Sequence, residues 1–119
     1  MLLDTNVLIH LIRAFPRAVR WAQGWATVPA CSEVSRAEIL RGARAAEMAN
    51  TESLFADLAW IPVTEVIARR AGALGREWGR QAHDLPDLLI AATALEAGLE
   101  IVTINVRDYP MFPGLHRPY

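Results

Sequence analysis

The first six residues, Met1-Leu2-Leu3-Asp4-Thr5-Asn6, decide how the rest of the chain can fold. They combine a short aliphatic segment, typical of a buried strand, with a carboxylate at its end, and the apolar run Val7-Leu8-Ile9 follows at once. Thr5 and Asn6 favour the start of a helix, so the sequence predicts a strand that passes directly into a helix. In sheets covered by helices, ligands bind at the edge where strands end, and Asp4 is expected at that edge.

Length and composition indicate one folded domain that spans residues 1–119. Hydrophobic residues make up 53% of the chain and charged residues 21%, which excludes a disordered chain and leaves apolar surface for a partner. Cys31 is the single cysteine, so no disulfide forms within the chain and a reducing cytoplasm is the expected compartment. No stretch approaches the length needed to cross a bilayer, so we expect a soluble protein with no membrane partner.

All twelve basic residues are arginine, and the net charge is −1. The codon usage of a GC-rich genome explains the absence of lysine without any functional cause. The absence still excludes mechanisms that need a lysine. Arginine, moreover, suits contact with phosphate because its planar guanidinium pairs with two oxygens at once.

Periodicity predicts strands that alternate with helices along the whole chain. The expected strands cover residues 1–3, 28–31, 59–63 and 101–104. The expected helices cover residues 5–14, 16–24, 33–48, 50–58, 64–82 and 85–97. This alternation favours an α/β fold, a three-layer α/β/α sandwich around a mainly parallel sheet of four to five strands with right-handed crossovers.

Glu38 lies in the predicted helix over residues 33–48, and two interpretations of it are open. The pattern Ser35-Arg36-Ala37-Glu38 is that of a capping box, in which Glu38 only caps a helix that begins at Ser35. Alternatively, Ser32 is the N-cap and Glu38 belongs to the second turn. We prefer Ser32, because an apolar stripe already runs through Ser35. Its members are Val34, Ala37, Leu40 and Ala43.

The loop His83-Asp84-Leu85-Pro86-Asp87 also has two interpretations. A metal phosphohydrolase of the His-Asp kind needs further histidines, and only His10 and His116 remain. The preferred interpretation makes Asp84 the N-cap of the helix over residues 85–97 and places Asp87 near its positive end. By spacing alone, Asp87 needs no role beyond stabilising that helix.

The predicted topology nevertheless brings four acids to one place. Helix N-termini and strand C-termini share one edge of a parallel sheet, so Asp4, Glu38, Asp87 and Asp108 are expected together. At an effective dielectric of about 20, two charges about 4 Å apart repel by about 4 kcal/mol. Protons or a cation must relieve this repulsion. Carboxylate oxygens suit Mg²⁺, with Mn²⁺ as a substitute, and a magnesium ion that keeps open positions can bind phosphate and activate a water.

Four segments together resemble the PIN-domain family, and in particular its small VapC-like toxin ribonucleases. They are Leu3–Ile9, Ser35–Gly42, Leu85–Ala94 and Val102–Tyr109. The resemblance covers essentially the whole chain, with the four motifs in the right order. It implies that Asp4, Glu38, Asp87 and Asp108 are the catalytic metal ligands. Thr5 and Asn105, with Thr103, would support the site through hydrogen bonds.

The resemblance also implies an activity and partners. The activity is that of an Mg²⁺-dependent endoribonuclease, the toxin of a toxin-antitoxin pair, which hydrolyses RNA by a metal-activated water and leaves a 5′-phosphate and a 3′-hydroxyl. The partners are the RNA substrate, a cognate antitoxin and a second copy in a homodimer. One departure is Ile104, where many relatives have an arginine. It puts an arginine contact to RNA in doubt, and Arg107 is a possible substitute.

Three other classes of protein share part of this sequence pattern. A haloacid dehalogenase phosphatase needs a second aspartate where this chain has Asn6, and usually a lysine; a receiver domain also needs a lysine. Neither fits. The remaining alternative is a catalytically silent PIN-like module that binds RNA or a protein partner, and the presence of all four acids argues against it.

Overall fold

The computed structural model describes residues 1–79 and 84–119. Four short strands, all parallel, form one sheet in the order β3-β2-β1-β4. Their bounds are Leu2–Leu3 for β1, Ala30–Ser32 for β2, Ala59–Ile61 for β3 and Ile101–Val102 for β4. The predicted α/β/α sandwich with a parallel sheet is confirmed, at the lower of the two expected strand numbers.

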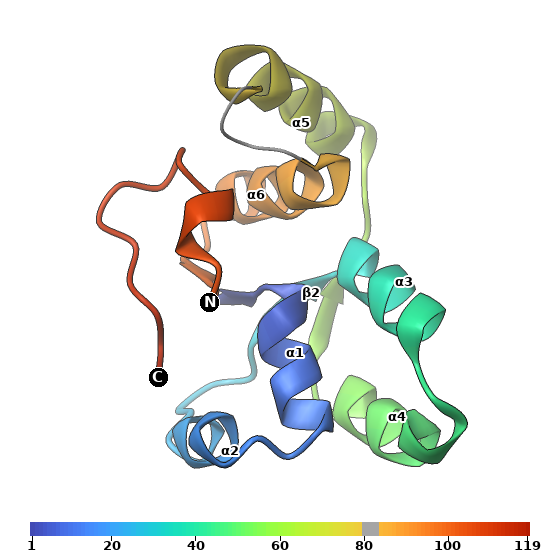
Figure 1. Ribbon diagram of the computed structural model, residues 1–119. Coiled ribbons are helices and arrows are strands. Elements are labelled where there is room, and N and C mark those ends of the chain that lie inside the picture. The colour runs from blue at the N-terminus through green and yellow to red at the C-terminus, as the bar shows by residue number, and fades with distance from the viewer. Residues whose placement is uncertain (80–83) are drawn as a thin grey trace.

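Helices cover both faces of this sheet, as Figure 1 shows, with α5 and α6 on one side and α1, α2 and α4 on the other. The α-helices are α1 (Thr5–Ile12), α2 (Pro16–Ala22), α3 (Glu33–Gly42), α4 (Met48–Ala56), α5 (Glu65–Trp78) and α6 (Leu85–Ala97). Two 3₁₀ turns, η1 (Ala45–Glu47) and η2 (Val106–Asp108), complete the described elements. None of the helices in residues 1–79 and 84–119 is long and apolar enough to span a membrane.

The two residues of β1 divide the core between the faces. Leu2 packs with α5 and α6, in a cluster that includes Leu74 and Ile90. Leu3, the next residue, packs with α1 and with Phe55 of α4 on the opposite face. Both leucines are fully buried. Successive side chains of a strand point to opposite faces, so β1 must be apolar throughout to sit between two helical layers.

The two predicted N-cap positions near the acids are confirmed. Ser32 is the N-cap of α3, and its hydroxyl accepts a hydrogen bond of 3.1 Å from the backbone N–H of Val34. Asp84 occupies the N-cap position of α6, but its side chain makes no capping hydrogen bond. Gly98 ends α6 with φ of 64°, a left-handed conformation that glycine adopts without a steric cost. These ends fix where α3 and α6 begin on the sheet edge.

The prediction for the helix over residues 33–48 was wrong in its extent and in part of its buried face. The helix expected to continue to residue 48 ends at Gly42, because Ala43 adopts an extended backbone and a 3₁₀ turn and α4 follow. The end expected at residue 82 cannot be compared, since residues 80–83 lie outside the described part of the chain.

The expected apolar stripe of α3 faces the core at Val34 but not at Ala37 and Leu40. Leu40 is 39% exposed and Ala37 is exposed, whereas Ser35 and Ile39 are buried. The physical reason is a hydrogen bond of 2.9 Å between the hydroxyls of Ser35 and Thr5, which turns the polar side of α3 toward α1. This rotation points Glu38 toward the start of α1.

Candidate active site

Asp4 lies between β1 and α1, and the fold buries it almost completely, with 3% of its surface exposed. Its Oδ1 accepts hydrogen bonds of 2.8 Å from the backbone N–H of Thr5 and from the hydroxyl of Tyr109. Its Oδ2 accepts one of 2.7 Å from the hydroxyl of Thr103. Burial raises the pKa of Asp4, and these three donors oppose that rise by stabilising the carboxylate.

Glu38 reaches the same edge from α3. Its Oε1 accepts a hydrogen bond of 2.7 Å from the hydroxyl of Thr5, the residue next to Asp4. Thr5 has one hydroxyl proton, so when it donates to Glu38 the hydroxyl of Ser35 must donate to Thr5. The resulting chain of hydrogen bonds, Ser35 to Thr5 to Glu38, joins α3 to the start of α1.

Asp87 lies in the first turn of α6 and is half-buried. Its pKa is raised to about 7, first by burial and then by the negative charges of Asp108, Asp4, Asp84 and Glu38. The exposed Asp84 adds to this repulsion by its position just before α6. The other three predicted acids are therefore near enough to Asp87 to act on it electrostatically, and Asp87 is the group on which their charges converge.

Asp108 ends the η2 turn after β4 and is half-buried. Its charge raises the pKa of both Asp4 and Asp87, which places it at the same edge although 104 positions separate it from Asp4. Asn105 lies just before this turn. The side chain of Asn105 is exposed, and its backbone N–H donates a hydrogen bond of 3.0 Å to the hydroxyl of Thr103.

Two residues of the site were missed by sequence reasoning. Tyr109 is 1% exposed and donates to Asp4, while its ring packs into the core beneath α6. Burial and the neighbouring acids raise the pKa of its phenol, so the hydroxyl keeps its proton and remains a donor. Ser35 was assigned only to a possible capping box. For Tyr109, its position directly after Asp108 was the one feature of the sequence that could have indicated a role in the site. For Ser35, no feature of the sequence indicated such a role.

The donor set at this edge fits a hard divalent cation in its chemistry. It consists of carboxylates, and the raised pKa of Asp87 indicates an excess of negative charge that a cation would relieve. Over residues 1–79 and 84–119, however, no three Asp, Glu, His or Cys side chains have the mutual arrangement of a metal-binding group. The acids gather at one edge without forming a closed set of ligands.

The predictions for His83 and Arg107 are not tested by the structure. The His-Asp interpretation involves His83, which lies outside the described residues. Arg107, the possible substitute for the arginine missing at Ile104, lies in η2 with an exposed side chain. Its role in RNA contact stays a prediction.

Comparison with known proteins agrees with this fold. The family model for the PIN domain matches residues 1–108. The chain belongs to the PIN-domain family. Within the family it is similar to the VapC ribonucleases. Ribonuclease VapC19 of Mycobacterium tuberculosis is 41% identical over 124 residues, covering 99% of this chain and 98% of the relative. Ribonuclease VapC10 of the same species is also 41% identical, covering 100% and 92%.

Solved structures give the same result. A chain of a toxin-antitoxin complex from Klebsiella pneumoniae superposes with a TM-score of 0.85 at 32% identity, covering 99% of this chain and 97% of that chain. A chain of DNA-bound VapBC from Salmonella typhimurium superposes with a TM-score of 0.76 at 25% identity, covering 98% and 94%. The resemblance inferred from the four motifs is confirmed.

Proposed function

We propose that this chain is an Mg²⁺-dependent endoribonuclease that acts as the toxin of a toxin-antitoxin pair. The names of its relatives support ribonuclease activity. The observation that carries the metal-dependent mechanism is the repulsion among the acids at one sheet edge, which raises the pKa of Asp87 to about 7. A site with this excess of negative charge does not bind an RNA phosphate unaided, because phosphate is itself anionic. A divalent cation relieves both the repulsion among the acids and their repulsion of the RNA phosphate.

The four acids have different roles in this proposal. Asp4 is the fixed ligand, since three hydrogen bonds hold its carboxylate in place. Glu38 and Asp108 complete the acidic edge from either side of Asp4. In the metal-free protein Asp87 holds a proton up to about neutral pH, as its raised pKa indicates, and it loses that proton when its carboxylate holds the cation. When bound, Mg²⁺ supplies charge neutralisation for the scissile phosphate and lowers the pKa of a water. Thr5 and Thr103 orient Glu38 and Asp4 by hydrogen bonds, and Asn105 supports Thr103.

The partners in this proposal are single-stranded RNA, a cognate antitoxin and a second copy of the chain. An antitoxin is supported by the similar structures, one of which is a toxin-antitoxin complex. The homodimer and the cytoplasmic location rest on the family resemblance. Cleavage is proposed to leave a 5′-phosphate and a 3′-hydroxyl.

A catalytically silent module that binds RNA or a protein partner is the second candidate. One observation favours it: the described residues contain no closed group of metal ligands. The two candidates predict opposite results when purified protein, free of co-purified inhibitor, is incubated with mixed RNAs in Mg²⁺, Mn²⁺ or EDTA.

We expect cleavage in Mg²⁺ or Mn²⁺, none in EDTA, and at least about a 100-fold loss in Asp4→Asn, the scale of effect typical when a group essential to a mechanism is removed. Asp57→Asn is the matched control, because Asp57 is an exposed aspartate at the end of α4. Cleavage that survives both EDTA and Asp4→Asn would contradict the proposal. In cells, toxicity that disappears with Asp87→Asn would separate the enzyme from the silent module.

A further inference from the structure

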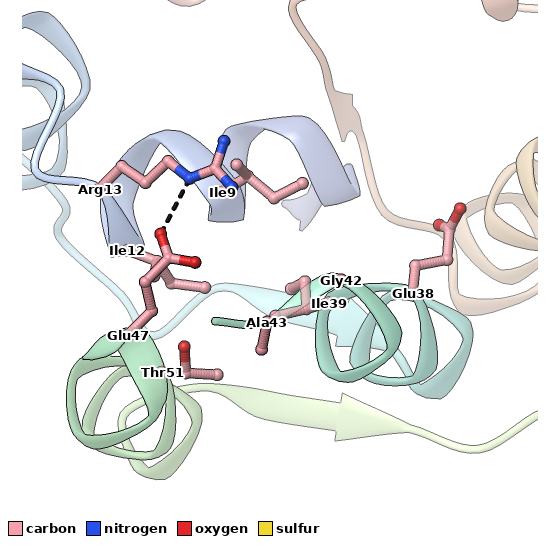
Figure 2. Close-up of a pocket in the computed structure, with 9 residues that line it drawn as sticks. All are labelled: Ile9, Ile12, Arg13, Glu38, Ile39, Gly42, Ala43, Glu47 and Thr51. Carbon is pink, nitrogen blue, oxygen red and sulfur yellow. Dashed lines mark hydrogen bonds and ion pairs between the residues drawn. The ribbon is translucent and has the colours of Figure 1, made fainter. Parts of the chain in front are cut away.

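A small cavity lies beside the acidic edge, between α1, α3, η1 and α4. Its volume is about 110 Å³, several times what a single ordered water needs. Isoleucines at positions 9, 12 and 39 form much of its wall, and Glu38 lies at one end (Figure 2). The cavity is therefore mainly apolar, with a few polar groups at defined positions. This combination is typical of a small-ligand site.

The hydroxyl of Thr51 lines this cavity without a hydrogen-bond partner. Thr51 is fully buried, and its Oγ1 makes no hydrogen bond to any described residue. A threonine inside a helix usually avoids this by donating to the carbonyl four residues earlier, as Thr93 of α6 does to Leu89 at 2.7 Å. Thr51 does not use that option, and Figure 2 shows its hydroxyl directed between α1 and η1. An unpaired buried hydroxyl destabilises the fold unless something else pairs with it.

The position of Glu38 connects this cavity to the acids. Glu38 lines the cavity and also accepts the hydrogen bond from Thr5, the neighbour of Asp4. The cavity therefore adjoins the acidic edge, within reach of a base next to a phosphate bound there. Unpaired bases of single strands are free to turn out of the stack and enter such a pocket.

A planar base has the chemistry to match both the apolar walls and the unpaired hydroxyl. The isoleucines offer apolar contact to the ring, while its edge carries donors and acceptors for Thr51. An aliphatic side chain from a protein partner would fill the same space but leave the hydroxyl unpaired. At the rim, Arg13 forms an ion pair of 2.9 Å with Glu47 and is half-exposed, so its guanidinium can also meet the sugar-phosphate backbone.

We propose that this cavity binds one unpaired nucleobase of the RNA substrate, next to the scissile phosphate, and sets part of the cleavage preference. The inference rests on the proposed ribonuclease function. It assigns Thr51 as a specificity residue through its hydroxyl, and the isoleucine walls as the contact surface for the ring.

Thr51→Val tests the hydroxyl alone, because valine has nearly the same shape. With an RNA of random sequence and sequencing of the cut ends, we expect wild type to prefer particular bases at one position beside the cut. In Thr51→Val this preference falls by about three- to tenfold, the value of one hydrogen bond. Cleavage itself continues. Ser53→Ala is the control, because Ser53 is an exposed hydroxyl of the same helix. An unchanged preference in Thr51→Val overturns the proposal.

Two further measurements separate this inference from the proposed function. Ala43→Leu is designed to fill the cavity, so it should weaken RNA binding and alter the preference while thermal unfolding shows a folded protein. In Asp4→Asn with Mg²⁺, where little cleavage is expected, short single-stranded RNA should shift the methyl NMR signal of Thr51. Cleavage by wild type without this shift in Asp4→Asn refutes the base pocket alone. If the variants weaken only the binding of a protein partner, the cavity belongs to that partner and the proposal is wrong.

Discussion

The hydroxyl of Tyr109 connects the last part of the chain to the carboxylate that ends β1. It donates a hydrogen bond of 2.8 Å to Oδ1 of Asp4, and both residues are buried. A hydrogen bond to a charged group in such surroundings contributes more than one at the surface. At the scale of single residues, the site therefore depends on a neutral donor as well as on its acids.

Tyr109→Phe removes this donor and keeps the ring. We expect the free energy of unfolding to fall by about 1–3 kcal/mol, the range for a hydrogen bond to a charged group. RNA cleavage should fall by about tenfold, since Asp4 loses one of the bonds that orient it. Both effects can be measured by urea unfolding and by the cleavage assay of the proposed function.

Tyr119→Phe is the matched control for Tyr109→Phe. The hydroxyl of Tyr119 hydrogen bonds to His10 at 2.9 Å, and the side chain is only partly buried. Its loss should leave cleavage within about twofold of wild type, since an isolated near-surface substitution has a small effect. Equal losses of activity in the two variants would contradict the assigned role of Tyr109.

Among the secondary-structure elements, α3 matters most for the site through its orientation, because that orientation places Glu38 beside Thr5. It is a helix of ten residues in which few side chains are buried, and its start is fixed by the hydroxyl of Ser32 on Val34. Glu38 lies two turns from that start. An N-cap that holds the first turn therefore also holds Glu38 in register with Thr5.

Ser32→Ala should destabilise the protein by about 1 kcal/mol through loss of this cap. In urea unfolding, we expect a lower midpoint concentration and an unchanged slope of the unfolding free energy against urea concentration. The control is Ser53→Ala, an exposed position inside α4, where alanine should be neutral or slightly stabilising because it favours helices. A neutral Ser32→Ala would mean that the contact between Ser35 and Thr5, rather than the cap, fixes α3.

At the scale of the whole molecule, the fold brings negative charges together, and their repulsion lowers the stability of the folded state. The ordinary pKa of an aspartate is 3.8, and that of Asp87 is raised to about 7 in the folded protein. Between these values the folded state binds a proton that the unfolded state has released. Without metal, stability therefore falls as pH rises from about 4 to about 7, and changes little from this source beyond that range.

The melting temperature of metal-free wild type should accordingly fall by several degrees between pH 5 and pH 8, relative to that of Asp87→Asn. Added Mg²⁺ should raise it again at pH 8, because a ligand that binds only the folded state stabilises it. Asp57→Asn should follow the wild-type profile, as the aspartate at this position is exposed and distant from the edge. Parallel profiles for wild type and Asp87→Asn would contradict the charge argument.

The sequence alone determined the alternating elements, the N-cap positions Ser32 and Asp84, and the shared edge of the four acids. These follow from local rules: periodicity, capping chemistry and the direction of parallel strands act over a few residues or through topology. The apolar segment before Asp4 is informative because a strand buried on both faces tolerates little else.

Only the tertiary structure decided which side of α3 is buried and which neutral groups hold the acids. Local apolar periodicity favoured Leu40 for the core, but the hydroxyls of Thr5 and Ser35, thirty positions apart, pair across two helices and rotate α3 instead. Tyr109 likewise meets Asp4 across 105 positions. Such contacts depend on side chains meeting after the sheet has formed, and no pattern within one segment specifies them.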